Sequence, residues 1–475
     1  MWGGGWRLKY ARVRSTGERP FAVTMFVPGP GRCDPTAQRQ VVRGISPARP
    51  RPTGTAMRIS TALYRRTAAA SAFLLSAACG NATEPGPAGS TPQVIEALPR
   101  QLTAGEQKLI ASTNDFSFNL FRQLSTAQKD SNVFTSPLSA SMALGMTMNG
   151  AANATFDQMR TALAFGTATE SDINASYKSL IALLRGLDPT VDFRIANSIW
   201  YRNTFPFNQP FLDATKTSFD ATVTGLDFSN PSSVTTINNW VSTATVAKIP
   251  KIIDEIDSDM VMLLINAIYF KGSWREKFDV AKTIDAPFHA VGGDQPAKLM
   301  HRGGKIAHYS TATFDAADLP YGNSAFTMTV VLPKAGTSVE TVASSLQGNA
   351  WSTMAAQFRD ATMDLYLPRF KLEWERTLND DLKALGMRDA FVPNGADFTR
   401  MSPLGKRLYI SFVKQKTYVD VNEEGTEAAA VTSVGVYVTS APVPVVMRVD
   451  RPFIFVIRER LSGTVVFMGK IVKLP

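Results

Sequence analysis

The chain of 475 residues is long enough for several domains, and its 44% hydrophobic content is enough for a large core. The formal net charge of +10 would suit a nucleic-acid-binding protein, but the whole excess lies at the amino terminus. Removal of residues 1–79 takes away 13 of the 50 basic and 2 of the 40 acidic residues and leaves a net charge of −1, so we expect no nucleic-acid partner.

The first 56 residues carry no pattern of a folded element. They show no apolar periodicity and are rich in glycine, proline and arginine. We interpret residues 1–56 as a disordered upstream over-extension, with Met57 as the true start of the protein.

A secretory signal follows. A basic start leads into an apolar stretch over residues 67–75, which is too short to span a bilayer as a helix. The small residues before Cys79 resemble a bacterial lipoprotein box, in which this cysteine carries the lipid; ordinary signal cleavage near Ala78 is the alternative. We therefore expect residues 57–79 to direct a protein that is secreted, or lipid-anchored to a bacterial membrane outside the cytoplasm.

The remainder divides into a tether and one domain. Residues 80–100 are rich in proline, glycine and serine, which is typical of a flexible linker. Residues 101–475 contain no second linker and no repeat, so we expect a single domain there, although it exceeds the usual domain size.

Helical patterns dominate the first part of this domain. Apolar residues recur at spacings of three and four over residues 106–126, and a similar helix is predicted over residues 170–187. Ser136 followed by Pro137 is typical of a helix start and predicts a third helix over residues 136–151.

Strand patterns dominate the second part. The runs are apolar or alternating, and they end at proline, glycine or charged residues. They cover residues 260–274, 325–333, 362–374, 417–422 and 451–459. Helices followed by strands predict an α+β domain with a large, mostly antiparallel sheet.

The residue types that an enzyme or a metal site needs are scarce. No cysteine follows Cys79, the chain has three histidines, and it lacks the serine-hydrolase elbow and the phosphate-binding loop. Asp380 and Asp381 stand at a predicted helix start, where the helix dipole favours acidic residues. We therefore expect neither catalysis nor a bound metal or cofactor.

One stretch near the carboxyl end does not read as an ordinary loop. Residues 422–446 are NEEGTEAAAVTSVGVYVTSAPVPVV. An acidic turn leads through three alanines into β-branched residues that predict a strand, and two prolines then end it. A strand of small residues inside a long loop needs an explanation.

Motifs along residues 102–475 resemble the serpin superfamily in order and spacing. They include NVFTSPLSASMALGMTMNGA, INNWVSTATVAKIPKII, LLINAIYFKGSWREKF and DRPFIFVIRERLSGTVVFMGKI, and EEGTEAAA resembles the hinge of inhibitory members. The resemblance implies the serpin fold, in which helices pack around a large, mostly antiparallel main sheet, with smaller sheets and an exposed reactive-centre loop.

The resemblance also implies suicide inhibition of a serine protease. The protease cleaves the loop, and the cleaved loop enters the main sheet as an extra strand before the acyl-enzyme hydrolyses. We expect a monomer that holds a serine protease covalently and is not itself an enzyme. Few basic residues lie where some members have a heparin-binding helix, so we expect no heparin-type site.

The loop composition suits such an insertion. The resemblance assigns the hinge to Glu423, Gly425, Thr426, Glu427, Ala428, Ala429 and Ala430. Glycine tolerates the change of backbone angles that the hinge requires. Alternation along a strand turns Thr426, Ala428 and Ala430 toward the core and Glu427 toward solvent, so insertion buries no charge.

Two further groups carry over from the family residue by residue. The shutter beneath the sheet consists of Ser136, Ser139, Asn266 and Gln415. Gln415 replaces the family's usual histidine and still supplies a donor and an acceptor. The breach consists of Trp274 and Arg369, with Arg369 facing Glu423. Ala247 stands where the family commonly has glycine, and we expect little effect from it.

The scissile bond selects the target protease. The usual inhibitory spacing from Gly425 places it between Thr439 and Ser440, which suits an elastase-like or subtilisin-like enzyme. Cleavage after Tyr437 is the alternative and suits a chymotrypsin-like enzyme. A non-inhibitory serpin that serves as a binding or chaperone protein is the competing function, and a hydrolase of unrecognised geometry ranks last.

Overall fold

The computed structural model describes residues 21–26, 92–426 and 443–475. All of them fall within one compact unit. The predicted signal peptide, most of the predicted linker and the loop residues 427–442 lie outside the described residues.

Nine α-helices form within the described ranges, and the three that the sequence predicts are confirmed as α1, α2 and α4. The helices are α1 Ala104–Ala127, α2 Pro137–Met148, α3 Asn153–Ala162, α4 Glu170–Arg185, α5 Gln209–Phe219, α6 Ser232–Ala244, α7 Val339–Ser345, α8 Gly348–Gln357 and α9 Asn379–Ala384. Three short 3-10 helices are η1 Val280–Lys282, η2 Asp389–Phe391 and η3 Gly405–Arg407. None of the described helices is long and apolar enough to cross a membrane.

Helix α2 is the buried centre of the molecule. All 12 of its residues are buried, which is the pattern of a helix surrounded by protein on every side. It contacts β5 of one sheet and β16 of the other. Pro137 occupies its first turn, where a missing backbone N–H costs nothing.

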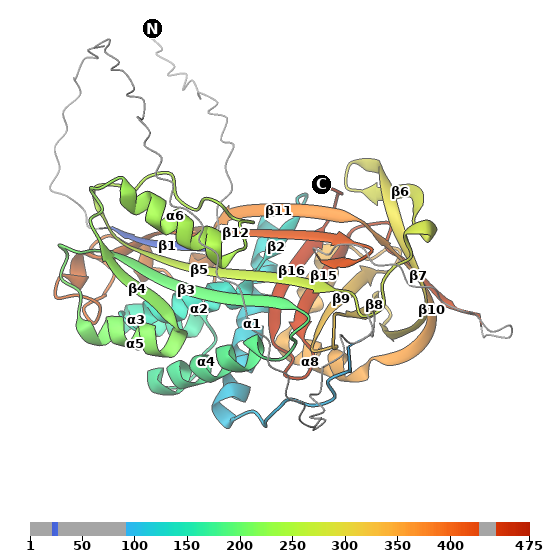
Figure 1. Cartoon of the computed structure of the whole chain (residues 1–475), viewed down its shortest axis with the longest axis horizontal. Coiled ribbons are helices and arrows are strands. Elements are labelled where there is room, and N and C mark those ends of the chain that lie inside the picture. Colours follow the sequence, from blue (N-terminus) through green and yellow to red (C-terminus); the bar gives the residue numbers. More distant parts are fainter. Residues whose placement is uncertain (1–20, 27–91, 427–442) are drawn as a thin grey trace, which may run out of the picture. The chain divides into compact units, whose positions relative to one another are not determined.

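The main sheet holds seven strands in the described part of the chain (Figure 1). They are β1 Phe21–Phe26, β3 Asp192–Arg202, β4 Ala221–Leu226, β5 Met260–Ser273, β11 Phe370–Thr377, β12 Tyr409–Asn422 and β13 Gly425–Thr426. The order runs from β11 through β12, β5 and β3 to β4, with β13 and β1 both between β12 and β5. Only the β3–β4 pair is parallel among the described strand pairs of this sheet, so the predicted mostly antiparallel sheet is confirmed.

A second sheet holds nine strands among the described residues. They are β2 Val133–Thr135, β6 Ile284–Ala290, β7 Gly293–Ser310, β8 Phe314–Pro320, β9 Phe326–Pro333, β10 Arg359–Pro368, β14 Val445–Arg448, β15 Phe453–Glu459 and β16 Val465–Ile471. The 18-residue β7 is long enough to pair with β6 and β10 as well as with β8, and so joins two groups of strands into one sheet.

Both faces of β5 are covered, which explains its continuous apolar sequence. Met262 and Leu264 belong to the main hydrophobic core. Leu263 and Ile265, on the opposite face by strand alternation, pack in a second cluster with Ile237 of α6. A strand buried on both faces reads as an apolar run rather than as an alternation.

Candidate functional site

A gap between β5 and β12 is the candidate functional site. The two strands are both antiparallel to β13, which fills one end of the gap. Thr426 of β13 pairs with Gly272 of β5 and with Val421 of β12. Strand β1 fills the other end and is likewise antiparallel to both neighbours.

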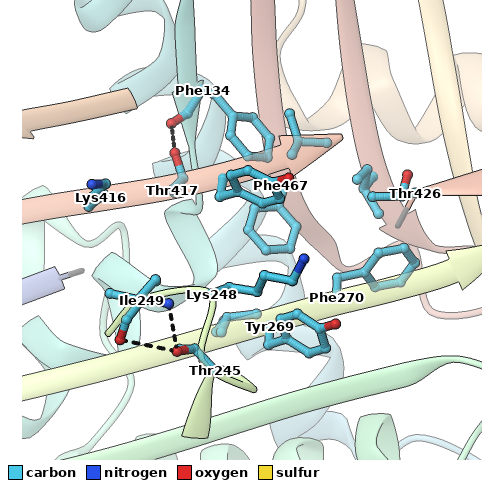
Figure 2. A pocket seen from close by; sticks show the side chains of 14 residues that line it. Phe134, Thr245, Lys248, Ile249, Tyr269, Phe270, Lys416, Thr417, Thr426 and Phe467 are labelled. Carbon is cyan, nitrogen blue, oxygen red and sulfur yellow. Dashed lines mark hydrogen bonds between the residues drawn. The ribbon is translucent and has the colours of Figure 1, made fainter. Parts of the chain in front are cut away.

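The middle of the gap has no described strand in it. The facing edge of β5 is unpaired there over residues 267–271. A narrow cavity of about 30 Å³ opens at this point, and Figure 2 shows Tyr269 and Phe270 on one side of it and Thr417 on the other. Such a volume has room for a water molecule or two. A new strand can therefore enter only if the side chains that line the middle of the gap move aside.

The hinge end of the gap is tightly packed. Gly425 has φ +152°, and a Cβ there would lie 2.2 Å from the carbonyl oxygen of Gly272. Thr426 is buried, and its hydroxyl lies 2.8 Å from the hydroxyl of Tyr321. Burial raises the pKa of Tyr321, which keeps its hydroxyl protonated and able to donate. The inward direction predicted for Thr426 is confirmed.

The chain just before the hinge is anchored by polar contacts. The buried Glu423 carboxylate accepts from Arg369 Nε at 2.7 Å, so the two residues that the sequence pairs do contact each other. Trp274 donates from its indole to the carbonyl of Asn422 at 2.8 Å and stacks on Tyr321 with ring centroids 4.5 Å apart. These contacts fix the point from which the loop leaves the sheet.

The four predicted shutter residues line one small cavity under the gap. The Gln415 amide donates to the carbonyl of Ser136 at 2.8 Å and accepts from the Thr135 hydroxyl at 2.5 Å. Ser139 donates to the side-chain oxygen of Asn266. Gln415 therefore bonds as both donor and acceptor, and these contacts contain no group that titrates.

A short segment after α6 crosses in front of the gap. Its Thr245 hydroxyl accepts from the backbone N–H of Ile249 at 3.1 Å, and the Lys248 side chain lies across the space between the strands (Figure 2). Val246 and Ala247 have φ +53° and +59°. A β-branched residue is rarely left-handed, so the segment is strained, and a glycine would relax the position of Ala247.

Several predicted site residues lie outside the described residues. They are Glu427, Ala428, Ala429 and Ala430 of the hinge, Thr439 and Ser440 at the scissile bond, and Cys79 at the lipidation box. Sequence analysis gave no role to Tyr321 or Lys248. Both lie within motifs of the family, but their contacts involve residues more than 100 positions away along the chain.

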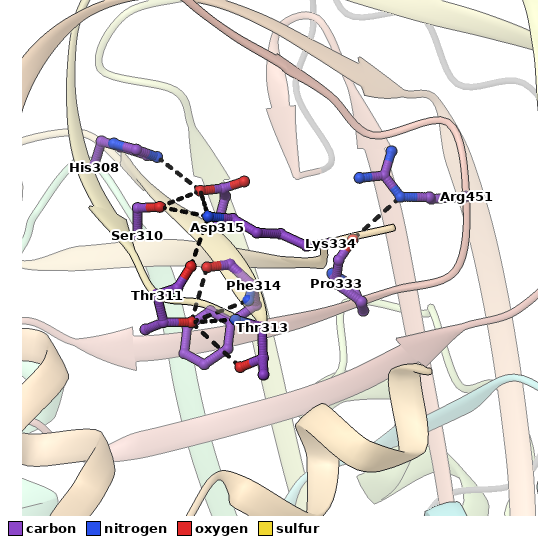
Figure 3. A network of polar contacts seen from close by, with 9 residues as sticks. All are labelled: His308, Ser310, Thr311, Thr313, Phe314, Asp315, Pro333, Lys334 and Arg451. Atoms are coloured by element: carbon purple, nitrogen blue, oxygen red, sulfur yellow. Dashed lines mark hydrogen bonds and ion pairs between the residues drawn. The ribbon is translucent and has the colours of Figure 1, made fainter. Parts of the chain in front are cut away.

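A cluster of serine, histidine and aspartate tests the hydrolase alternative (Figure 3). Ser310 donates to the Asp315 carboxylate at 2.7 Å, and His308 lies 3.6 Å from the same oxygen. Lys334 donates to Ser310 and to the backbone of the β7–β8 turn. A catalytic triad needs the histidine between the serine and the aspartate. Here Ser310 and His308 both approach Asp315, so the cluster connects β7 and β8 and does not form a triad.

The acidic pair at the start of α9 is also structural. Asp381 is buried and accepts from Arg376 Nε at 2.7 Å, whereas the Asp380 side chain is exposed. Across the part of the chain that the structure describes, no three His, Cys, Asp or Glu side chains are grouped to hold a metal ion.

Comparison with known proteins decides the family. A family model described as Serpin (serine protease inhibitor) matches residues 111–474. This chain belongs to the serpin family. It is 34% identical over 383 residues to the leukocyte elastase inhibitor of Sus scrofa, covering 77% of this serpin and 99% of that relative.

Solved serpin structures share the fold. The thermophilic serpin tengpin in its native state has a TM-score of 0.70 at 31% identity, with 81% of this serpin and 98% of tengpin covered. Human thyroxine-binding globulin complexed with thyroxine also has a TM-score of 0.70, at 27% identity, with 78% and 100% covered. The family thus contains protease inhibitors and a thyroxine-binding protein.

Proposed function

We propose that this serpin inhibits serine proteases as a suicide substrate. The protease cleaves the loop between Thr439 and Ser440 and remains attached as an acyl-enzyme. Residues 427–439 then enter the gap between β5 and β12 as a new strand and carry the protease with them before deacylation.

Strand β13 is the observation that carries this proposal. Gly425 and Thr426 already form a short strand, paired on both sides at the mouth of the gap. Each further residue of the cleaved loop can therefore add to an existing ladder, which avoids the cost of starting a new strand between two others. The anchored Glu423 sets the start of that strand.

The composition of the loop supports continued insertion. Thr426 is buried, so alternation sends Ala428, Ala430 and Thr432 to the same side, and none of them carries a charge. Small side chains need little separation of the flanking strands. A charge at one of these positions would be buried without a partner and would stop insertion.

The magnitudes suffice to displace a protease. Residues 426–439 would span about 46 Å at 3.3 Å per residue. Hydrogen bonds on both edges, at about 1 kcal/mol net each, would contribute on the order of 10 kcal/mol. The uncleaved form would then persist because insertion is slow, and not because it is the most stable state.

The target and the location follow from the loop and the leader. Thr439 before the scissile bond suits an elastase-like or subtilisin-like protease, and cleavage after Tyr437 would suit a chymotrypsin-like one. We place the protein outside the cytoplasm as a monomer, held to a bacterial membrane through a lipid on Cys79 or secreted after cleavage near Ala78.

A second candidate function is that of a non-inhibitory binding protein. The observation that favours it is the structural similarity to human thyroxine-binding globulin. The hinge GTEAAAVTS, which carries no proline and no inward charge, favours inhibition instead.

Incubation with elastase, chymotrypsin and subtilisin, followed by a denaturing gel, tests the proposal. We expect a band at the summed mass of serpin and protease, because the acyl bond survives denaturant. Proteases inactivated at their catalytic serine serve as the control and should give no such band. Cleavage of the loop by every protease without a complex would favour the second candidate.

A further inference from the structure

Residues Phe21–Phe26 form a strand inside the gap of the main sheet. Ala22 pairs with Ile265 of β5 and with Lys414 of β12. The remaining residues of β1 continue along both neighbours to Met260 and Tyr409. Figure 1 shows this strand, in blue, beside β12 and β5. It has the same direction in the sheet as β13.

The pairing registers of β1 and β13 show which positions of an inserted loop β1 occupies. Thr426 of β13 lies opposite Gly272 and Val421. Continuation of this register one residue at a time brings Ser433 opposite Ile265 and Lys414. These are the two partners of Ala22. Phe21–Phe26 therefore occupies the positions that residues 432–437 would take after full insertion.

Two segments thus occupy the two ends of the gap, and the middle of the gap holds no described strand. Strand β13 holds the hinge end, and β1 holds the far end. The unpaired stretch of β5, residues 267–271, corresponds to positions 427–431 of an inserting loop. The cavity of Figure 2 lies along this stretch, so the empty part of the gap is its middle alone.

We propose that β1 is a built-in competitor of the reactive loop, which keeps the far end of the gap occupied for as long as the chain retains it. This inference rests on the proposed function. With β1 in place, insertion stops after residue 431, a travel of about 17 Å instead of about 43 Å for residues 427–439. The protease is then displaced by only a fraction of the full distance, and hydrolysis releases it from a cleaved serpin.

The block by β1 can be removed, because β1 is joined to the domain only through the chain that follows it. Residues 27–91 join β1 covalently to the rest of the chain, and a covalently joined segment binds its site as an intramolecular ligand and not as a free peptide. A cut within residues 27–91 turns β1 into a separate peptide that can dissociate. Removal of β1 would therefore convert a substrate-like precursor into an inhibitor. This step requires that translation starts upstream of Met57 and that the chain folds before its leader is removed.

A reversible cross-link in the full chain tests this inference. The variant carries Ala22→Cys and Lys414→Cys, with Cys33→Ser and Cys79→Ser to remove the native thiols. Paired residues of an antiparallel ladder have Cα atoms close enough for a disulfide. We expect oxidised glutathione to form the 22–414 disulfide, detected by mass spectrometry. The control pair Ala22→Cys and Lys416→Cys, out of register, should not cross-link.

Two readouts follow in the oxidised and the reduced protein. The first is the yield of covalent complex, which we expect to fall by about tenfold or more on oxidation, because the disulfide prevents β1 from leaving the gap and so removes the molecules that are competent to trap the protease. The second is the gain in thermal midpoint after loop cleavage, which oxidation should reduce to the part that residues 427–431 contribute and which reduction should restore.

The outcomes separate this inference from the proposed function. Failure of the 22–414 disulfide to form, or equal readouts in both states, would overturn the inference and leave inhibition standing. Absence of a complex and of any gain in midpoint in both states, and also in a chain shortened to begin at residue 92, would remove the proposed function, and the competitor with it.

Discussion

At the scale of single residues, Gly425 limits how the loop can leave the sheet. We expect Gly425→Ala to weaken inhibition, because its Cβ would meet backbone atoms of Gly272 and Ser273 at 2.2 and 2.7 Å. Backbone cannot rotate away, so β13 would be pushed out of the gap at a cost of about 1–3 kcal/mol. The measurement is the number of serpin molecules consumed per protease molecule trapped, which should rise.

Gly186 offers a matched control. It ends α4, has a negative φ, and its added Cβ would have no neighbour nearer than 3.9 Å. Gly186→Ala should leave the ratio unchanged. A ratio for Gly425→Ala equal to that of the parent would mean that the hinge does not start from β13.

Sequence reasoning located residues whose roles depend on family motifs. It placed Gln415 beside Ser136 and Arg369 beside Glu423, and these contacts are present. It could not find Tyr321, because a tyrosine in a turn carries no local sign of the distant hydroxyl of Thr426 that it contacts. Ala247 was expected to matter little, yet its positive φ shows that the position favours glycine.

At the scale of elements, α1 owes its start to a buried carboxylate. Glu106 accepts from Arg100 at 2.6 and 2.8 Å and from the backbone of Thr103 at 2.8 Å. The hydrogen bonds from Arg100 are the main cause that lowers the pKa of Glu106 to about 2. This pKa lies below the ordinary value of about 4.3, so the charged form stabilises the fold.

The sign of the pH dependence follows from this pKa. The contribution of Glu106 is present above about pH 4.3 and is lost as the pH falls toward 2. We expect Glu106→Gln to destabilise the protein by about 2 kcal/mol at pH 7 and by less at pH 3. Urea unfolding followed by circular dichroism at the two pH values measures this. The exposed Glu96→Gln is the control, and an equal loss at both pH values would contradict the account.

Long elements could be predicted and short ones could not. Helix α1 and strand β5 carry apolar patterns over many residues, and both were predicted. Strand β13 has only two residues, and its existence depends on the partners that flank it. Strand β1 lies in a leader that composition places outside the fold, so its pairing is visible only in the structure.

At the scale of the whole molecule, the gap makes the main sheet incomplete. The outer edges of β5 and β12 are paired over residues 262–271 and 414–421, but the two strands share inner partners only at the ends of the gap. A completed ladder would satisfy more backbone groups than the uncleaved form does. The fold class could be predicted because the order of helices and strands sets it. That β13 and β1 occupy the two ends of the gap could not be predicted, because this depends on pairing between distant segments.

The gain in thermal midpoint after loop cleavage tests this account most directly. The loop is cut within residues 432–439 by a protease that is then removed, and calorimetry compares cut and uncut protein. Ala428→Arg places a charge on the inward side set by Thr426, and Ala429→Arg places the same charge on the outward side, so the two form a matched pair.

The leader-free parent is the chain shortened to begin at residue 92. We predict that loop cleavage raises the thermal midpoint of this parent and of its Ala429→Arg variant by on the order of 20 °C, because new strand pairing contributes about 10 kcal/mol. Ala428→Arg should show little or no rise, because insertion would bury an unpaired charge. A leader-free parent whose midpoint is unchanged by cleavage would contradict insertion of the loop into the gap.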